Sequence, residues 1–270
     1  MTDFMKETIL SLVSPEYPWK DHFHWLEETG STNDDLKVLA RKGAPHGTVL
    51  IADRQSGGHG RMGRSFHSPG GVGIYFSILL RPQCRPGQLM HLTCATAVAM
   101  CDAVEAAAGF RPGIKWTNDL VCGKRKLGGI LTELGLSANG TVDYAIIGIG
   151  INCCQKEEDF APEIQGIAAS LSMITERDID RTKVAAAMMD SLHKMDTILL
   201  TEKAAILDRY RRDCITIGQE ISLLRVGEEV RHGKAVDMDD EGALLVAFPD
   251  GHTETVNSGE VSVRGMYGYV

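Results

Sequence analysis

Long apolar runs, separated by short polar and glycine-rich segments, predict most of the strands of this chain. Residues 72–80, VGIYFSILL, are almost all apolar, which predicts a strand buried on both faces. Residues 126–136 and 141–153 predict two further strands joined by a hairpin turn at Asn139-Gly140. The other predicted strands are 47–53 and 113–120, and the second leads into a short hairpin through Gly123-Lys124.

Helices are predicted where the polar pattern includes capping residues. Ser31 or Thr32 can accept a hydrogen bond at the start of a helix over 31–43, and Gly43 ends it. Two more helices are predicted within residues 180–213.

The most apolar helix is predicted over residues 86–109. Pro86 stands at its start and Gly109 follows its end. Asp102 and Glu105 interrupt its apolar run, and no run in the chain approaches the roughly 20 residues of a membrane helix. We therefore expect no membrane association.

The pattern changes after Cys214. Short β-rich segments follow, separated by glycine and charge: GQEISLL, EEVRHGKAVDMD, GALLVAF, HTETV and VSVRG. They predict a small β-barrel of about fifty residues. We therefore expect an α+β protein, with a mixed central sheet and helices in a domain over residues 1–214 and the small barrel in 215–270.

Composition is that of a soluble globular protein, with 43% hydrophobic and 24% charged residues. The formal net charge of −8 argues against general attraction to nucleic acid, although it leaves a local basic site possible. The seven cysteines include no C-x-x-C pair, and the acidic N-terminal segment has no small-residue cleavage site. These features favour a reducing cytoplasm.

The segment over residues 57–71, GGHGRMGRSFHSPGG, contains the pattern G-x-G-x-x-G. A dinucleotide site needs a helix opening at the last glycine and an acidic residue about 20 positions later. Pro69 prevents that helix, and no acidic residue lies between Asp53 and Asp102. The same span holds Arg54, Arg61, Arg64, Arg81 and Arg85. The segment therefore favours a phosphate or acyl phosphate held by backbone N–H groups and arginine, with a solvated surface loop as the alternative.

A second charged cluster lies in KWTND (115–119) and GKRKLGG (123–129). A hairpin would bring six polar residues close together: Lys115, Asn118, Asp119, Lys124, Arg125 and Lys126. The glycines after Lys126 allow backbone to approach a ligand, and Asp119 is a hard oxygen ligand suited to Mg²⁺. A charged hairpin in water is the alternative for this stretch.

Together these motifs resemble those of biotin protein ligases. The resemblance runs from about residue 24 to the C-terminus and rests on the order and spacing of the motifs. They are STND (31–34), RQSGGHGRMGRSFHSPGGVGIYFSILLRP (54–82), IKWTNDL (114–120), RKLGGILTEL (125–134) and IIGIGIN (146–152), followed by the terminal small barrel. The resemblance implies a fold related to class II synthetases and an SH3-like C-terminal barrel.

The family's binding residues transfer to this chain position by position. The resemblance places the biotin site at Ser31, Thr32, Asn33, Gln55, Gly58, His59, Gly60, Arg61, Lys126 and Gly129. It places the nucleotide site at Arg61, Arg64, Trp116, Asn118, Lys126 and Asn152, with Arg61, Lys126 and Asp119 as catalytic groups and Asp119 as a Mg²⁺ ligand. Two positions depart from the family pattern: His59 replaces a more basic residue, and Thr117 replaces proline.

The implied reaction uses ATP, biotin and Mg²⁺ to form biotinyl-AMP, and then biotinylates a lysine of a biotin carboxyl carrier protein. The alternatives are a lipoate- or octanoate-attaching enzyme, a biotin-binding regulator without turnover, and a nucleotide-binding repressor. Some relatives carry an N-terminal DNA-binding domain. Only about twenty residues precede the first shared segment, so we expect no DNA binding here, and either a monomer or a homodimer.

Overall fold

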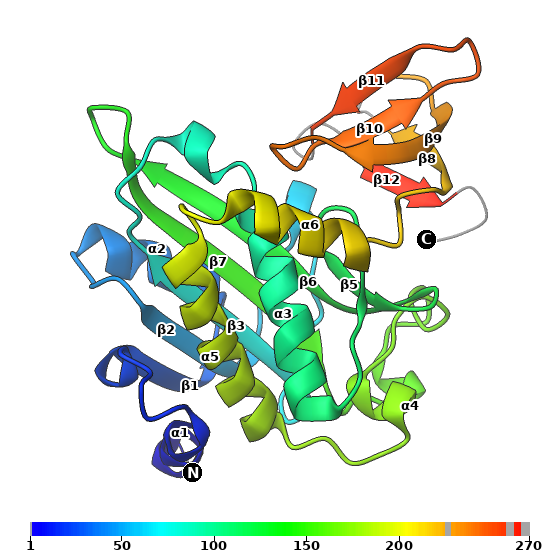
Figure 1. The fold of residues 1–270 in the computed structure, drawn as a ribbon. Coiled ribbons are helices and arrows are strands. Elements are labelled where there is room, and N and C mark those ends of the chain that lie inside the picture. Colours follow the sequence, from blue (N-terminus) through cyan, green and yellow to red (C-terminus); the bar gives the residue numbers. More distant parts are fainter. Residues whose placement is uncertain (1, 225–227, 258–261, 266–270) are drawn as a thin grey trace.

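The computed structural model describes residues 2–224, 228–257 and 262–265 of the 270-residue chain (Figure 1). Its centre is a mixed seven-stranded sheet with the order β1-β2-β3-β7-β6-β5-β4. β1 and β2 are parallel, and the other neighbours are antiparallel. The strands are β1 (Phe23–Thr29), β2 (Thr48–Gln55), β3 (Gly73–Leu80), β4 (Gly113–Lys115), β5 (Asp119–Cys122), β6 (Arg125–Leu136) and β7 (Val142–Asn152).

Helices cover both faces of this sheet. The helices α3 and α5 pack against each other on the face nearest the viewer in Figure 1, and α6 packs across α3. α2 packs on β2, β3 and β7, and α1 packs on α5 and β1. The α-helices are α1 (Thr2–Leu12), α2 (Thr32–Arg41), α3 (Leu92–Ala108), α4 (Leu171–Thr175), α5 (Arg181–Ile198) and α6 (Lys203–Asp213). Short 3₁₀ helices are η1 (Lys20–His22), η2 (Arg61–Gly63), η3 (Pro86–Leu89) and η4 (Glu157–Asp159).

Alternate residues of the central strands pack into two separate cores. Ile78 and Leu80 of β3 belong to the large core, which also contains α3 and α5. Leu79, between them, faces the other way and packs in a small core with Leu36 of α2. Every residue of β3 is buried, so the prediction of a strand buried on both faces is confirmed.

The apolar segment Pro86–Ala108 is long and apolar enough to cross a membrane, but 72% of its most apolar window is buried inside the fold. It serves as the central helix of the large core. The prediction of one continuous helix is wrong, because η3 ends at Leu89 and α3 begins at Leu92. His91 has a non-helical backbone at this break, and its buried Nε2 lies 2.8 Å from the Leu199 carbonyl oxygen.

The predicted helix ends are confirmed at two sites. The Ser31 hydroxyl caps α2 by accepting from the Asp34 N–H group, and Gly109 ends α3 with a φ of 74°. By contrast, α1 and β1 were not predicted. β1 is an edge strand with one buried residue, Phe23, so its sequence shows no apolar run.

Strands between Glu220 and Gly265 form a second, smaller sheet. Its five strands are antiparallel in the order β11-β10-β9-β8-β12. The strands are β8 (Glu220–Leu224), β9 (Arg231–Met238), β10 (Leu244–Ala247), β11 (Thr253–Val256) and β12 (Ser262–Gly265). The α+β class, with a mixed sheet and a small C-terminal β unit, is confirmed.

A close contact at Gly47 holds the start of β2 against the N-terminal segment. A β-carbon on Gly47 would lie 2.2 Å from the Trp19 indole, and the backbone there has a φ of 78°. Trp19 is itself buried beside Tyr17, His46 and His193. The position therefore needs glycine both for its backbone and for the ring that covers it.

Gly47→Ala should lower the free energy of unfolding by about 2–4 kcal/mol, because it adds a clash to the backbone strain. Gly43→Ala is the matched control. Gly43 has a φ of 87° but nothing within 4 Å of the added carbon, so strain alone should cost about 1 kcal/mol. Urea unfolding measures both variants. Equal losses would show that the Trp19 contact is unimportant.

Candidate active site

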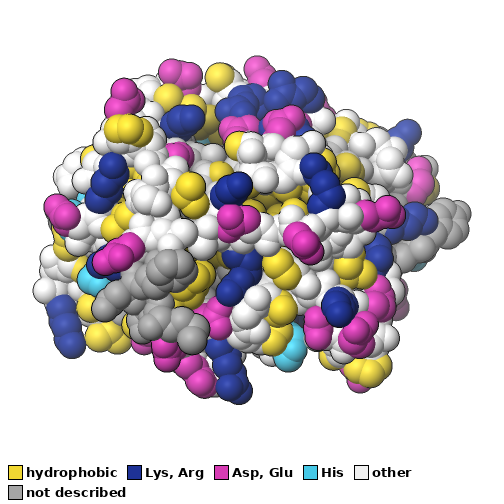
Figure 2. All heavy atoms as spheres, turned by 90° about the horizontal axis from the view of Figure 1, so that it is seen from below, with side chains coloured by type: hydrophobic (Ala, Val, Ile, Leu, Met, Phe, Trp, Pro, Cys, Tyr) yellow, Lys and Arg dark blue, Asp and Glu magenta, His cyan; other side chains and the backbone are white. Residues whose placement is uncertain are grey.

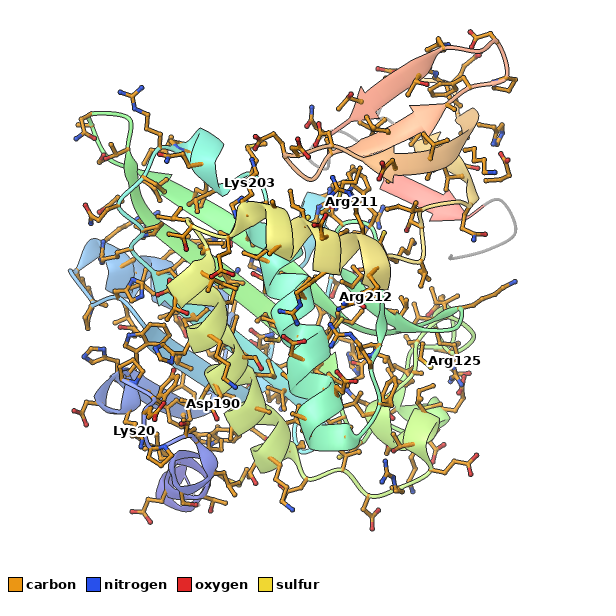
Figure 3. All side chains as sticks on the ribbon, viewed as in Figure 1. Lys20, Arg125, Asp190, Lys203, Arg211 and Arg212 are labelled. Atoms are coloured by element: carbon orange, nitrogen blue, oxygen red, sulfur yellow. The ribbon has the colours of Figure 1, made fainter. Side chains whose placement is uncertain are left out.

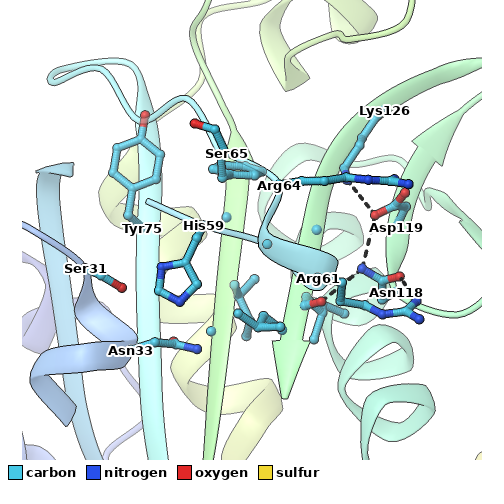
Figure 4. A pocket seen from close by; sticks show the side chains of 18 of the residues that line it. Ser31, Asn33, His59, Arg61, Arg64, Ser65, Tyr75, Asn118, Asp119 and Lys126 are labelled. Atoms are coloured by element: carbon cyan, nitrogen blue, oxygen red, sulfur yellow. Dashed lines mark hydrogen bonds and ion pairs between the residues drawn. The ribbon is translucent and has the colours of Figure 1, made fainter. Parts of the chain in front are cut away.

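A cavity of about 600 Å³ opens on the α2 side of the central sheet (Figure 4). Its walls come from the start of α2, the loop after β2, the turn between β4 and β5 and the facing residues of β3, β6 and β7. In Figure 4, Ser31, Asn33, His59 and Tyr75 lie toward one end, and Arg61, Asn118, Asp119 and Lys126 lie toward the other. The cavity therefore has a largely neutral end and a charged end.

Glycines of β7 make room for this cavity in the middle of the sheet. A β-carbon on Gly148 would lie 2.2 Å from Asn33 Oδ1, and one on Gly150 would lie 2.4 Å from the Phe66 ring. Gly129 of β6 pairs with Gly150 and also lines the cavity. On this face, side chains from elsewhere in the chain, those of Asn33, Phe66 and Lys126, lie over three glycine positions and line the cavity there.

A buried hydrogen-bond network forms the neutral wall. Gln55 Oε1 accepts from the Thr32 N–H group at 2.9 Å, and its Nε2 donates to Ser68 Oγ at 3.1 Å. The fully buried Ser77 hydroxyl lies 2.7 Å from Thr32 Oγ1 and 2.6 Å from Asn33 Oδ1. Asn33 Nδ2 donates to Glu133 Oε2 at 2.9 Å. The side-chain amides of Asn33 and Gln55 each use both their oxygen and their nitrogen in hydrogen bonds, so the wall presents a fixed pattern of donors and acceptors.

Two hydrogen-bonded pairs build the charged end. Arg61 donates to Asn118 Oδ1 at 2.9 Å, and Lys126 Nζ donates to Asp119 Oδ1 at 2.6 Å. Asn118 is itself fixed, because its Nδ2 donates to the Ile130 carbonyl at 3.0 Å. Burial lowers the pKa of Arg61, an effect that the Asp119 carboxylate partly offsets. Arginine stays charged under such a shift, so this end presents cations to an anion.

The loop over residues 57–71 folds over the cavity. It is held to β2 by a bridge between Gln55 and Ser68, and closed on itself by a bridge between His59 and Ser65. Phe66 packs over Gly150 and lies edge-on to Tyr75, with ring centroids 6.4 Å apart. The glycine-rich segment is therefore a cover for the cavity, and no dinucleotide-type helix follows it.

Most of the residues predicted for the site line this cavity, and two do not. The lining includes Ser31, Thr32, Asn33, Gln55, His59, Gly60, Arg61, Arg64, Trp116, Asn118, Asp119, Lys126 and Gly129. Gly58 lies behind it, against Phe66 and Ser68. The Asn152 side chain is buried, with Nδ2 donating to the Ala169 carbonyl at 3.1 Å.

The excess of arginine over residues 54–85 was partly misleading. Of these arginines, Arg61 and Arg64 line the cavity. Arg81 instead donates to the carbonyls of Ala40 and Ala44 and pairs with Asp143, so it fixes the end of α2 against the sheet. Arg54 lies within 3.7 Å of Glu28 on the surface. A run without acidic residues is therefore a poor guide to which arginines meet a ligand.

Several lining residues were not assigned from the sequence. Gly148 and Gly150 had a usable signal, because glycine alternates with isoleucine in GIGIN and so occupies one face of a strand. Lys115 is buried at the cavity; the sequence placed it in the charged cluster of KWTND but assigned it no role in the site. Ile167 comes from an irregular segment, where no periodic pattern could indicate it.

Comparison with known proteins identifies the family. Residues 25–152 match the Biotin/lipoate A/B protein ligase family, and residues 216–264 match the Biotin protein ligase C terminal domain. The bifunctional ligase/repressor BirA of Bacillus spizizenii is 37% identical over 245 residues, which cover 85% of this chain and 70% of the relative. The chain belongs to the biotin protein ligase family.

Other biotin protein ligases agree with this assignment. The biotin–[acetyl-CoA-carboxylase] ligase of Mycobacterium tuberculosis is 31% identical over 241 residues, covering 87% of this chain and 86% of the relative. The biotin protein ligase of Aquifex aeolicus, solved in complex with biotin and ATP, has a TM-score of 0.76 and 31% identity, covering 90% of this chain and 98% of that one. The match to a C-terminal domain of biotin protein ligases disfavours the lipoate alternative.

The Arg61–Asn118 contact should hold the covering loop of this ligase closed. Asn118→Ala removes the acceptor, so trypsin should cut after Arg61 roughly two- to tenfold faster, as expected for one lost hydrogen bond. Mass spectrometry of timed digests measures the cut. Asn139→Ala, in the exposed turn between β6 and β7, is the control. Unchanged cutting after Arg61 in Asn118→Ala would mean that other contacts close the loop.

Proposed function

We propose that this ligase activates biotin with ATP to form biotinyl-AMP, and then transfers the biotinyl group to a lysine of a biotin carboxyl carrier protein. One observation carries the proposal. A single cavity joins a neutral wall with fixed donors and acceptors to an end that presents arginine and lysine. Biotin has the matching polarity, with a neutral ureido ring at one end and a carboxylate at the other.

The neutral wall would bind the biotin rings. Ser31, Thr32, Asn33 and Gln55 offer hydroxyl and amide groups at this end of the cavity. The network with Ser77 fixes the side chains before a ligand arrives. A preformed polar wall reduces the entropy lost on binding. The part of the cavity beside the β7 glycines would take the fused rings beneath the loop that carries His59 and Gly60.

The charged end would carry out adenylation. A carboxylate oxygen of biotin attacks the α-phosphorus of ATP, and the bond from that phosphorus to the pyrophosphate oxygen breaks. Negative groups approach each other in this step, so the protein must supply positioning and positive charge. Arg61 and Lys126 would supply the charge, with Arg64 and Asn118 beside the nucleotide. Lys126 would exchange its bond to Asp119 for one to a phosphate oxygen.

The donors at this end also fit Mg²⁺. Among the residues described as lining the cavity, Asp119 is the one carboxylate, and no cluster of three potential ligands occurs in the described chain. A site with a single carboxylate suits Mg²⁺, which commonly binds one or two carboxylates together with phosphate oxygens and water. Asp119 would hold the ion, which would neutralise charge on the phosphates.

In the second step, the carrier lysine amine attacks the acyl carbon, and AMP leaves. The covering loop would shield the adenylate from water until the carrier arrives.

The described cysteines are all free thiols, which supports a reducing cytoplasm as the site of this reaction. Basic and acidic side chains are interspersed on the face shown in Figure 2. The expectation of no DNA binding stays a prediction.

The proposed reaction is tested directly. Purified protein with biotin, ATP and Mg²⁺ should release pyrophosphate, and should label a biotin carrier domain on its acceptor lysine. Pyrophosphate is measured by a coupled assay and labelling by mass spectrometry. A carrier variant with arginine at the acceptor position is the control and should stay unlabelled. Equal or better labelling with lipoate would overturn the biotin assignment.

Lys126→Ala should slow formation of biotinyl-AMP by roughly 100-fold or more, since it removes a charge-assisted donor from a partly buried site. Lys124→Ala, two residues earlier in the exposed turn between β5 and β6, removes the same charge and should retain near-normal activity. Single-turnover rates of adenylate formation compare the two. Comparable rates in the Lys126→Ala and Lys124→Ala variants would show that Lys126 takes no part in adenylate formation.

A further inference from the structure

The segment that carries Asn118 and Asp119 is held by residues near the C-terminal end of the chain. The Trp116 N–H group donates to Thr216 Oγ1 at 2.9 Å, and the Trp116 indole Nε1 donates to the Gly242 carbonyl at 3.0 Å. The Tyr210 hydroxyl donates to the Thr117 carbonyl at 3.0 Å. All of these bonds are buried.

The groups that make these bonds come from three different elements. Tyr210 lies on α6, Thr216 follows α6 before the small sheet, and Gly242 lies in the turn between β9 and β10. We infer that Tyr210, Thr216 and Gly242 are positioning residues for the nucleotide end of the site, which they set through Trp116 and Thr117. The inference rests on the proposed function of that end.

The turn at Gly242 is itself rigidly placed. Asp239 Oδ1 accepts from the N–H groups of Glu241 and Ala243, both at 2.9 Å. Gly242 has a φ of 90°, and a β-carbon there would lie 3.0 Å from Cys94 Sγ of α3. The turn therefore fits closely against the large core, so its carbonyl is a fixed acceptor for Trp116.

Two basic residues of α6 attach this turn to the main body. Arg211 donates to the Met238 carbonyl at 2.9 Å, and Lys203 pairs with Glu241. Both side chains are labelled on α6 in Figure 3, where that helix passes below the small sheet. The small sheet thus contacts the segment beside the site through a turn that α6 holds in place.

The neutral end of the cavity does not share this support. In the part of the chain that the structure describes, the side chains of Thr32, Asn33 and Gln55 bond to one another and to Ser68, Ser77 and Glu133. The positioning groups should therefore affect the nucleotide end while leaving the biotin end unchanged. A general loss of protein stability would weaken the binding of ATP and of biotin alike.

This asymmetry changes the role assigned to Trp116. The sequence resemblance made it a nucleotide-binding residue, and it does line the cavity. Its indole N–H, however, is bonded to Gly242, and the residue is buried. Its ring therefore serves as the link between the small sheet and the backbone that presents Asn118 and Asp119.

Thr216→Val tests the inference, because valine replaces the hydroxyl with a methyl group of similar size. Without its acceptor, the buried Trp116 N–H group is unsatisfied. We expect the KM for ATP in adenylate formation to rise about tenfold, while the dissociation constant for biotin alone stays within about twofold of wild type. Thr96→Val is the matched control, since the buried Thr96 hydroxyl bonds to Leu92 of its own helix, away from the site. It should change neither value.

Thr216→Ser keeps the hydroxyl and should restore the KM for ATP, which separates the hydrogen bond from packing. Isothermal titration gives the biotin constant, and pyrophosphate release gives the KM. Equal effects on both ligands, or identical behaviour of the Thr216→Val and Thr96→Val variants, would overturn the inference. A wild-type protein that releases no pyrophosphate with biotin would instead contradict the proposed function, so the two failures are distinguishable.

Discussion

The central constraint on this molecule is the absence of side chains at one patch of its main sheet. A sheet that is covered on both faces normally fills its interior with side chains. Here Gly129, Gly148 and Gly150 leave space that the Asn33 amide and the Phe66 ring partly occupy. The cavity, its polar wall and its covering loop all depend on this space. A β-carbon on Gly148 or Gly150 would overlap the groups that form the walls.

The charged end depends on a different balance. Arg61 is hydrogen-bonded to Asn118 and Lys126 to Asp119, and the Asp119 carboxylate also interacts favourably with the charge of Arg61. Without Asp119, the partly buried Arg61 and Lys126 would both lose a nearby negative charge, which is costly in a site shielded from water. The protein therefore maintains a cationic site by pairing it internally, and a ligand competes with those internal partners.

The fold was largely predictable because strongly apolar strands and well-capped helices carry local signals. β3, the β6–β7 hairpin and α2 are of this kind. β1 was missed because an edge strand buries little, and the break before α3 was missed because His91 is fixed by a distant carbonyl. The candidate site was predicted through motif resemblance. The roles inferred for Thr216 and Gly242 depend on contacts with a residue that lies 100 and 126 positions away in sequence, which no local pattern encodes.

The bonds between Trp116, Thr117 and the C-terminal region bear on how the chain could be divided. A cut after residue 214 would separate Trp116 from its partners Thr216 and Gly242 and leave two buried donors unsatisfied in the larger fragment. Reassociation of the fragments would restore both acceptors. The boundary between the large and small units is the natural place to split the chain. Because these two bonds cross it, we expect reassociation of the fragments to restore the backbone that presents Asn118 and Asp119.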